Sequence, residues 1–292
     1  MSSWSGNRQF AQAKKVQETI PFFQTTDGGF CSNFNHLFLA YANAVKTASP
    51  LYIHDFPNSV GKTFPLLQTI LKDNSTVKYL KEVSSISNAL EFTKIRTDFQ
   101  NLNATTNFQA LKRMARDLFF YNGDAQEKIM SRIRGAGLER IVFDVGVHIR
   151  SGDKITTGEM KPISVREYFN ALSGFSRRLG KANLSVFVMT DNMKLFEELK
   201  RFCPSTWSLM TLQNISAYTA NGHTQYIFNT LPTSTREDLF YQFLTELHIL
   251  QNTPNLIVTY SSNIGRFLYL TSRFQHTADS IVSLDVPQWS FV

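Results

Sequence analysis

Val145-Gly-Val-His-Ile-Arg-Ser-Gly-Asp-Lys154 is the stretch from which the fold of this chain can be worked out. It closes an apolar run that begins at Ile141, and a short run of this kind predicts a largely buried β-strand. Arg150 follows the last apolar residue directly, at the carboxyl end of the strand. Open α/β sheets bind their ligands at that edge, so the loop after Ile149 is the first candidate binding loop.

Beyond this strand the chain alternates short apolar runs with segments of helical periodicity. The capping-box pattern, in which a serine and a glutamate satisfy free amides at a helix start, occurs at Ser164–Glu167 and again at Ser234–Glu237. This alternation predicts an α/β fold with a parallel, doubly wound sheet whose binding loops share one edge. Strands are expected at 141–149, 184–189, 207–212 and 255–260, and helices at 164–180, 193–202, from 234 onward and at 264–273.

The first half of the chain has weaker patterns. Cys31 to Lys46 is expected to be helical, Leu51 to His54 to be a short strand, and residues 107–120 and 125–134 to be helices. Gly135-Ala-Gly137 is the best candidate for a hinge. We therefore expect an N-terminal domain at 1–137 and a C-terminal domain at 138–292.

Composition limits the classes of protein to consider. The chain has 292 residues, of which 42% are hydrophobic and 18% charged, as in a globular protein. A net charge of +7 favours an anionic partner: nucleic acid, an acidic membrane surface or a phosphorylated small molecule. The basic residues are dispersed and no nucleic-acid-binding motif occurs, so no nucleic-acid partner is expected.

Cysteine usage and hydropathy bear on the compartment. The only two cysteines, Cys31 and Cys203, lie far apart in the sequence, which favours a reducing compartment. No apolar run approaches the roughly 20 residues that a membrane span needs, and the start lacks a signal-peptide pattern. The expectation is a soluble, cytoplasmic protein without a transmembrane segment.

Arg150 and His148 are the first candidate ligand-binding residues. An arginine at the end of a buried strand is costly unless it meets an anion, and its planar fork suits phosphate oxygens. The alternative is an internal ion pair with Asp153. His148 lies two residues earlier on the same strand face, where it could reach the same ligand or serve as a satisfied core histidine.

A second candidate site lies where the last predicted strand becomes a helix. The hydroxyls of Ser261 and Ser262 and the free amides near Asn263 can hold a phosphate, or they can simply cap the helix. No metal-binding pattern is found, and Gly61-Lys-Thr63 lacks the upstream glycine of a phosphate-binding P-loop. Neutralisation of a phosphate is therefore expected to fall to arginine and backbone amides, with no metal or other cofactor.

The stretch 145–154 resembles the first motif of the fucosyltransferase superfamily, which includes the α1,6-, nodulation-factor and protein O-fucosyltransferases. Two further stretches resemble its later motifs and occur in the same order: 186–191, and 244–250 with its continuation to 263. In the first half, the loop Gly28-Gly-Phe-Cys-Ser-Asn-Phe-Asn35 and the helix after it are also similar. The resemblance implies a GT-B-like fold, with two Rossmann-like domains facing a cleft.

The resemblance also implies roles for individual residues. Arg150 would hold the β-phosphate of the donor and assist its departure, and Glu246 with His148 would contact the base or ribose. Glu159, with Lys154 beside it, is the nearest candidate for the base that activates the acceptor, and Asp153 is the second candidate. The full expected donor-binding set is His148, Arg150, Lys154, Glu246, Ser261, Ser262, Asn263, Gly28, Gly29 and Asn33.

Two positions depart from the family pattern. Ser151 stands where a second arginine is frequent, and Glu246 stands where α1,6-type enzymes have an aspartate that reads guanine. Both changes leave the identity of the donor open. The absence of the disulfides common in secretory-pathway members is consistent with a bacterial or viral enzyme.

The sequence thus predicts an inverting, metal-independent glycosyltransferase that moves a sugar from a nucleotide-sugar donor to a hydroxyl of a glycan or glycoprotein. GDP-fucose is the expected donor, and a UDP-sugar such as UDP-xylose is the alternative on the same fold. Two further readings stay open: a non-enzymatic protein that binds nucleotides or polyanions, and a degenerate transferase that binds without turnover.

Overall fold

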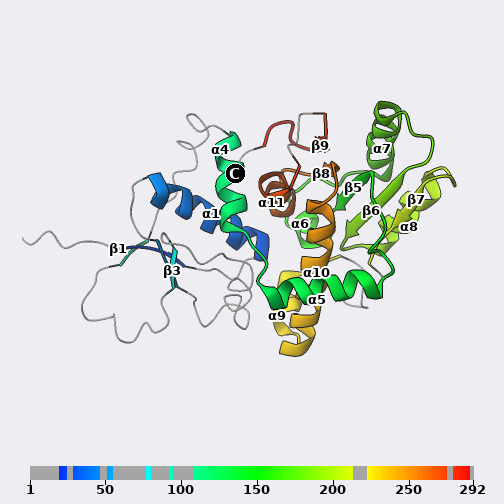
Figure 1. The fold of residues 1–292 in the computed structure, drawn as a ribbon. Coiled ribbons are helices and arrows are strands. Elements are labelled where there is room, and N and C mark those ends of the chain that lie inside the picture. The colour runs from blue at the N-terminus through cyan, green and yellow to red at the C-terminus, as the bar shows by residue number, and fades with distance from the viewer. Residues whose placement is uncertain are drawn as a thin grey trace, which may run out of the picture.

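A computed structural model of the chain describes residues 20–24, 29–46, 51–54, 77–79, 92–94, 108–212, 222–274 and 279–289. Its central feature is a parallel sheet of five strands in the order β7-β6-β5-β8-β9 (Figure 1). The strands are β5 (Val145–Ile149), β6 (Ser185–Thr190), β7 (Ser208–Met210), β8 (Asn255–Val258) and β9 (Ile281–Ser283). The predicted α/β fold with a parallel sheet is confirmed.

Strand β5 lies in the middle of this sheet, and every one of its residues is buried. Successive side chains of a strand point to opposite faces. Val145, Val147 and Ile149 pack into a cluster with α7 (Val165–Leu179) and α8 (Met193–Phe202). The opposite face is covered by α10 (Thr233–Gln251), since a side chain at Gly146 would collide with Leu250 of that helix. His148 and Arg150 therefore share the α10 side of the sheet.

The helix starts were predicted with mixed success. Helix α7 has the expected capping box between Ser164 and Glu167, and it ends at Gly180 in the left-handed conformation. The second predicted capping box is wrong: the N-cap of α10 lies two residues earlier, at Pro232, and no side chain caps the helix. Proline fixes its φ near the helical value, and the Pro232 carbonyl accepts the Arg236 amide at 3.0 Å, so the turn forms without Ser234.

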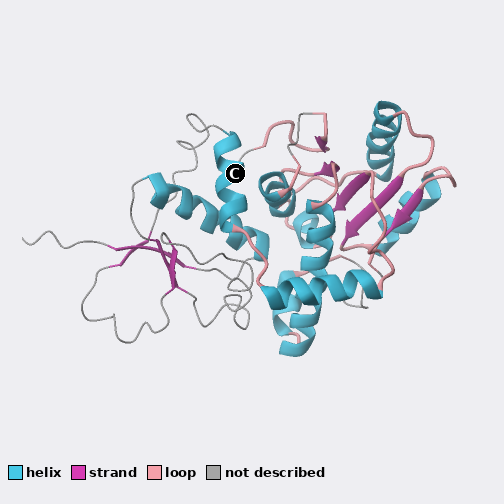
Figure 2. Cartoon of the chain, viewed as in Figure 1, coloured by secondary structure: helices cyan, strands magenta, loops and turns pink. Residues whose placement is uncertain are grey.

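The remaining helices of this half are α5 (Gly123–Gly135), α6 (Asp153–Thr156), α9 (Gln225–Thr230) and α11 (Asn263–Thr271). Figure 2 shows the arrows of β5 and β6 running in the same direction. Helix α6 starts at Asp153, shortly after β5 ends at Ile149, so it lies beyond the carboxyl end of that strand. The strand predicted at 141–149 is shorter than expected and starts at Val145. Residues 207–212 and 255–260 likewise form strands only at 208–210 and 255–258.

The first half contains a second parallel sheet in the order β3-β2-β1-β4. Its strands are β1 (Ile20–Gln24), β2 (Leu51–His54), β3 (Val77–Tyr79) and β4 (Phe92–Lys94). Helix α1 (Phe30–Lys46) and β2 match the predicted helix and strand, and α4 (Phe108–Leu118) lies within the predicted 107–120. The division into domains at 137/138 stays a prediction.

Helices α1 and α4 pack directly on the second half of the chain. The aromatic rings of Phe34, Phe119 and Phe267 meet edge to face at centroid distances of 4.9 to 5.6 Å. Phe30 adds ring contacts to Phe240 and Phe267. Aromatic pairs in this geometry stabilise beyond the area that they bury, so α1, α4, α10 and α11 share one core.

Two glycine substitutions should have opposite effects on stability. A Cβ at Gly265 would collide with the backbone carbonyl of Thr259, while a Cβ at Gly174, inside α7, would meet nothing within 4 Å. Gly265→Ala should therefore lower the free energy of unfolding by about 1–3 kcal/mol, and Gly174→Ala should raise it by up to about 1 kcal/mol. Urea unfolding measures both, and a neutral Gly265→Ala would contradict the close approach of β8 and α11.

Candidate functional site

The loop after β5 places Arg150 at the carboxyl edge of the sheet. Its side chain is only 10% exposed and forms ion pairs with Asp153 and Asp191. The pair with Asp153 is the internal pairing that the sequence left open, and the pair with Asp191 was not expected. A nearly buried guanidinium between two carboxylates is electrostatically compensated, so an anionic ligand would have to share it with, or take it from, these carboxylates.

Asp191 joins three segments of the chain at this edge. It follows β6, and its carboxylate accepts the Ser151 amide at 2.8 Å and the His223 amide at 3.1 Å in addition to Arg150. The neighbouring Asn192 caps α8 through the amides of Lys194 and Leu195. The carboxylate thus fixes the β5 loop and the segment before α9 to the end of β6.

Two glycines make the contact between these segments possible. Gly152 and Gly222 have φ values of 67° and 95°, and each lies against the backbone of the other's segment. The His223 carbonyl accepts the Asp153 amide at 3.0 Å. Positive φ favours glycine, and a Cβ at either position would collide with backbone atoms, so this contact requires both glycines.

His148 and Glu246 are buried ionisable residues on facing surfaces of β5 and α10. Gly146 of β5 packs against Leu250 of α10. From this contact toward the carboxyl edge, His148 lies two residues further along the strand. Glu246 lies one helical turn before Leu250, in the same direction. Among the described residues, no hydrogen-bond partner is found for His148 Nδ1 or for Glu246 Oε1. These buried polar atoms are the kind that a bound ligand would satisfy.

Burial shifts the protonation of both groups. Desolvation, with the positive charge of Arg150 as a second cause, lowers the pKa of His148 to about 3. Desolvation raises the pKa of Glu246 to about 8. At neutral pH, therefore, His148 is neutral and Glu246 holds its proton in most molecules, and both can offer hydrogen bonds without a charge.

The start of α11 carries the predicted phosphate-binding residues. Ser262 is the N-cap, and its Oγ accepts the Ile264 amide at 3.3 Å, so the capping alternative is observed. Ser261 donates its hydroxyl and its amide to Asp285, a residue that the sequence analysis missed. Burial raises the pKa of Asp285, but hydrogen bonds from Ser261, Ser283 and backbone amides outweigh it and keep the pKa below its usual value.

Helix α1 brings part of the first-half motif to the same place. Asn35 donates from Nδ2 to the Asn263 carbonyl at 3.1 Å, which ties α1 to the start of α11. Asn33 is fully buried in the first turn of α1, and its amide donates to the Gly29 carbonyl at 3.1 Å. The predicted site residue Gly28 lies outside the described residues.

Lys154 and Glu159 form the predicted neighbouring pair on and just after α6. The two side chains form an ion pair and are 30% and 55% exposed. The hydrogen bond from Lys154 is the main cause that lowers the pKa of Glu159. Glu159 is therefore ionised at neutral pH and open to solvent, as a proton acceptor must be.

The structure thus brings Arg150, Asp153 and Lys154 together just after β5, with His148 near the end of that strand and Glu246 buried on α10, which packs on the same sheet. It connects Asn263 to the start of α1. The roles assigned to these residues from the sequence stay predictions. Asp191, His223 and Asp285 were missed because their partners are far away in the sequence; only the position of Asp191 directly after a predicted strand could have indicated it.

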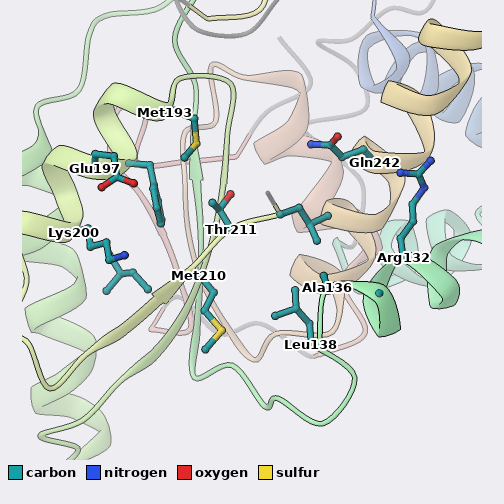
Figure 3. A pocket seen from close by; sticks show the side chains of 13 residues that line it. Arg132, Ala136, Leu138, Met193, Glu197, Lys200, Met210, Thr211 and Gln242 are labelled. Carbon is teal, nitrogen blue, oxygen red and sulfur yellow. The ribbon is translucent and has the colours of Figure 1, made fainter. Parts of the chain in front are cut away.

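A cavity of about 610 Å³ lies at the free edge of β7, away from these residues. It is lined by side chains of α5, α8, α10 and the residues of β7, among them Met193, Thr211 and Gln242 (Figure 3). No metal-binding group of three or more His, Cys, Asp or Glu side chains is found in the described part of the chain. Within the same residues, no helix is long and apolar enough to cross a membrane.

Neither a protein-family model nor a curated protein sequence matches the chain. Solved structures do. The chain has the fold of fucosyltransferases. A variant of Arabidopsis thaliana FUT1 in complex with GDP aligns with a TM-score of 0.52 at 10% identity, over 86% of this chain and 68% of that one.

NodZ, an α-1,6-fucosyltransferase soaked with GDP-fucose, aligns with a TM-score of 0.54 at 14% identity, over 88% of this chain and 94% of that one. NodZ from Bradyrhizobium gives a TM-score of 0.51 at 12% identity, over 89% and 96%. At such identities the likeness is one of fold. It confirms the GT-B-like α/β fold that the sequence resemblance implied.

Glu246 should make stability depend on pH. Its folded pKa of about 8 lies above the ordinary value of 4.5, so the folded state holds a proton that the unfolded state releases between these values. The contribution of Glu246 to the free energy of unfolding is fully present below pH 4.5 and is lost as the pH rises toward 8. Glutamine does not ionise, so Glu246→Gln should not lose this contribution at high pH. The variant should be more stable than the wild type by at least about 1 kcal/mol at pH 8.5 but not at pH 4.5.

Urea unfolding at the two pH values checks this expectation. Glu237→Gln, on the exposed part of the same helix, is the matched control for the substitution itself. An equal difference between Glu246→Gln and the wild type at both pH values would show that Glu246 is ionised in the folded protein.

Proposed function

We propose that this protein is a glycosyltransferase that moves a sugar from a nucleoside diphosphate donor, with GDP-fucose preferred, to a hydroxyl of a glycan or glycoprotein. The observation that carries the proposal is Arg150, held at the carboxyl end of the central strand. The fold is shared with a fucosyltransferase in complex with GDP and with another soaked with GDP-fucose. Ligands of such sheets bind at that edge, and a guanidinium is suited to a diphosphate.

The donor would lie along the carboxyl edge between β5 and α11. The diphosphate would take contacts from Arg150 and from the amides at the start of α11, where Ser262 caps the helix. The base would reach the space between β5 and α10, where His148 and Glu246 have buried atoms without a partner. Lys154, Ser261, Asn263, Gly28, Gly29 and Asn33 complete the proposed donor site.

Transfer would proceed as a single displacement with inversion and without a metal ion. The acceptor oxygen forms a bond to the anomeric carbon while the bond from that carbon to the β-phosphate oxygen breaks. Glu159 takes the proton of the acceptor hydroxyl, and Arg150 compensates the charge that develops on the departing nucleoside diphosphate. Asp153 is the second candidate for the base, although in this structure it pairs with Arg150.

Thermal-shift screening with GDP, GDP-fucose, UDP, CDP and ADP tests the donor. A ligand that binds only the folded state stabilises it by about 2.7 kcal/mol at 100 times its Kd. GDP and GDP-fucose should raise Tm, and Arg150→Ala should abolish the rise and lower turnover at least tenfold. Arg132→Ala, which removes a surface ion pair with Asp238, is the control and should keep both.

If UDP stabilises the protein more than GDP does, the proposed role of Arg150 stays the same, but the donor is a UDP-sugar such as UDP-xylose. Stabilisation by none of the nucleotides would contradict the proposal and favour a polyanion-binding protein. Binding of GDP with no release of GDP from GDP-fucose would indicate a degenerate transferase.

Glu159→Gln separates donor binding from transfer. The amide cannot take the acceptor proton, so transfer to a glycan acceptor should be lost while the Kd for GDP stays within twofold of the wild type. Glu167→Gln is the matched control, because glutamine also completes a capping box and should leave transfer intact. Full transfer by Glu159→Gln would move the base to another residue, with Asp153 the first to examine.

A further inference from the structure

Asp191 carries more contacts than a helix-flanking residue needs. Its side chain is 13% exposed, and the two carboxylate oxygens accept from three donors on two segments of the chain. Oδ1 accepts the Ser151 amide, and Oδ2 accepts both the His223 amide and Arg150 Nη1. The cap of α8 is supplied by Asn192, so capping does not explain Asp191.

These contacts fix the direction of the Arg150 side chain. An arginine on a loop has many rotamers, and ordering it costs conformational entropy. Two backbone amides anchor the Asp191 carboxylate, which cannot follow a moving side chain. An ion pair with an anchored carboxylate therefore holds the guanidinium in one place before any ligand arrives, and prior positioning is what makes charge stabilisation effective in a transition state.

The same carboxylate holds the segment from Gly222 to Thr224 against the loop of Arg150. His223 contributes its amide to Asp191 and its carbonyl to the Asp153 amide. Gly152 and Gly222 lie in backbone contact beside these hydrogen bonds. Loss of the negative charge would thus leave the guanidinium with only the Asp153 ion pair of the two described, on its own loop, and would loosen the contact that supports this loop.

We infer that Asp191 is the positioning residue for Arg150: it acts on sugar transfer through the guanidinium and touches neither donor nor acceptor. This inference rests on the proposed function and adds a residue to it. Its consequence is that the effect of Asp191 on turnover exists only while Arg150 is present, which a double-mutant cycle can measure.

Asp144 provides a matched control at the opposite end of the same strands. Its side chain is 15% exposed, it pairs with Lys181, and it accepts the Ser185 amide at 3.0 Å. It therefore joins the starts of β5 and β6 as Asp191 joins their ends. Asp144→Asn removes the same kind of contact far from the proposed donor site.

The experiment measures release of GDP from GDP-fucose, the Kd for GDP, and urea unfolding for five forms of the full chain. These are the wild type, Asp191→Asn, Asp144→Asn, Arg150→Ala and the double variant Asp191→Asn with Arg150→Ala. Asp191→Asn should lower kcat at least tenfold, and Asp144→Asn should stay within twofold. In the Arg150→Ala background, Asp191→Asn should lower kcat by less than twofold.

Two results would overturn the inference. One is a kcat for Asp191→Asn within twofold of the wild type, and the other is an undiminished loss when Arg150 is already alanine. If Arg150→Ala itself keeps full turnover, the proposed function fails first. If Asp191→Asn does not fold, Asp191→Glu takes its place in the double-mutant cycle. Glutamate keeps the negative charge but displaces it by one methylene group. The same two results would then overturn the inference.

Discussion

The ion pair between Arg150 and Asp191 is the interaction on which the candidate site depends. It joins the ends of β5 and β6, and through Asp191 it also holds the segment before α9. Parallel strands bring their carboxyl ends to one edge, but they leave the loops beyond that edge without a common support. A carboxylate anchored by two backbone amides supplies that support, and the glycine pair at 152 and 222 allows the loops to come close enough to use it.

The charged network at the edge and the buried groups beneath it obey different electrostatics. The charges of Arg150, Asp153 and Asp191 compensate one another in ion pairs, although little of these side chains is exposed. In the part of the chain that the structure describes, neither His148 nor Glu246 forms an ion pair, so burial drives both toward their neutral forms. A nucleotide would then meet charge at its phosphates and neutral hydrogen-bonding groups at its base, which matches the distribution of charge in the ligand itself.

The shared core of α1, α4, α10 and α11 connects the two halves of the chain at the candidate site. The start of α1 reaches the start of α11 through Asn35 and Asn263, close to the proposed phosphate position. A cluster of phenylalanines packs behind this contact. The unusually frequent phenylalanine of the sequence is thus used in part to hold α1 against the second half of the chain. Fucosyltransferases at 10 to 14% identity reach the same fold with largely different residues.

The sequence by itself determined most of the longer elements from residue 141 onward and the edge of the sheet at which the candidate site lies. It did not predict β1, β3, β4, β9, α6 or α9. Local patterns such as the apolar run before Arg150 and the capping box at Ser164 are short-range signals, and the motifs between 145 and 263 gave the fold class. The sequence failed at Ser234, because the N-cap of α10 is Pro232, two residues earlier. Only the tertiary structure decided which side chains pair across the site. The side chain of Asp285 and that of Asp191 meet partners that are 24 to 41 residues away in the sequence. The burial of His148 and Glu246 depends on how α10 packs on β5. Such contacts arise from packing of distant segments, for which a single sequence holds no local signal.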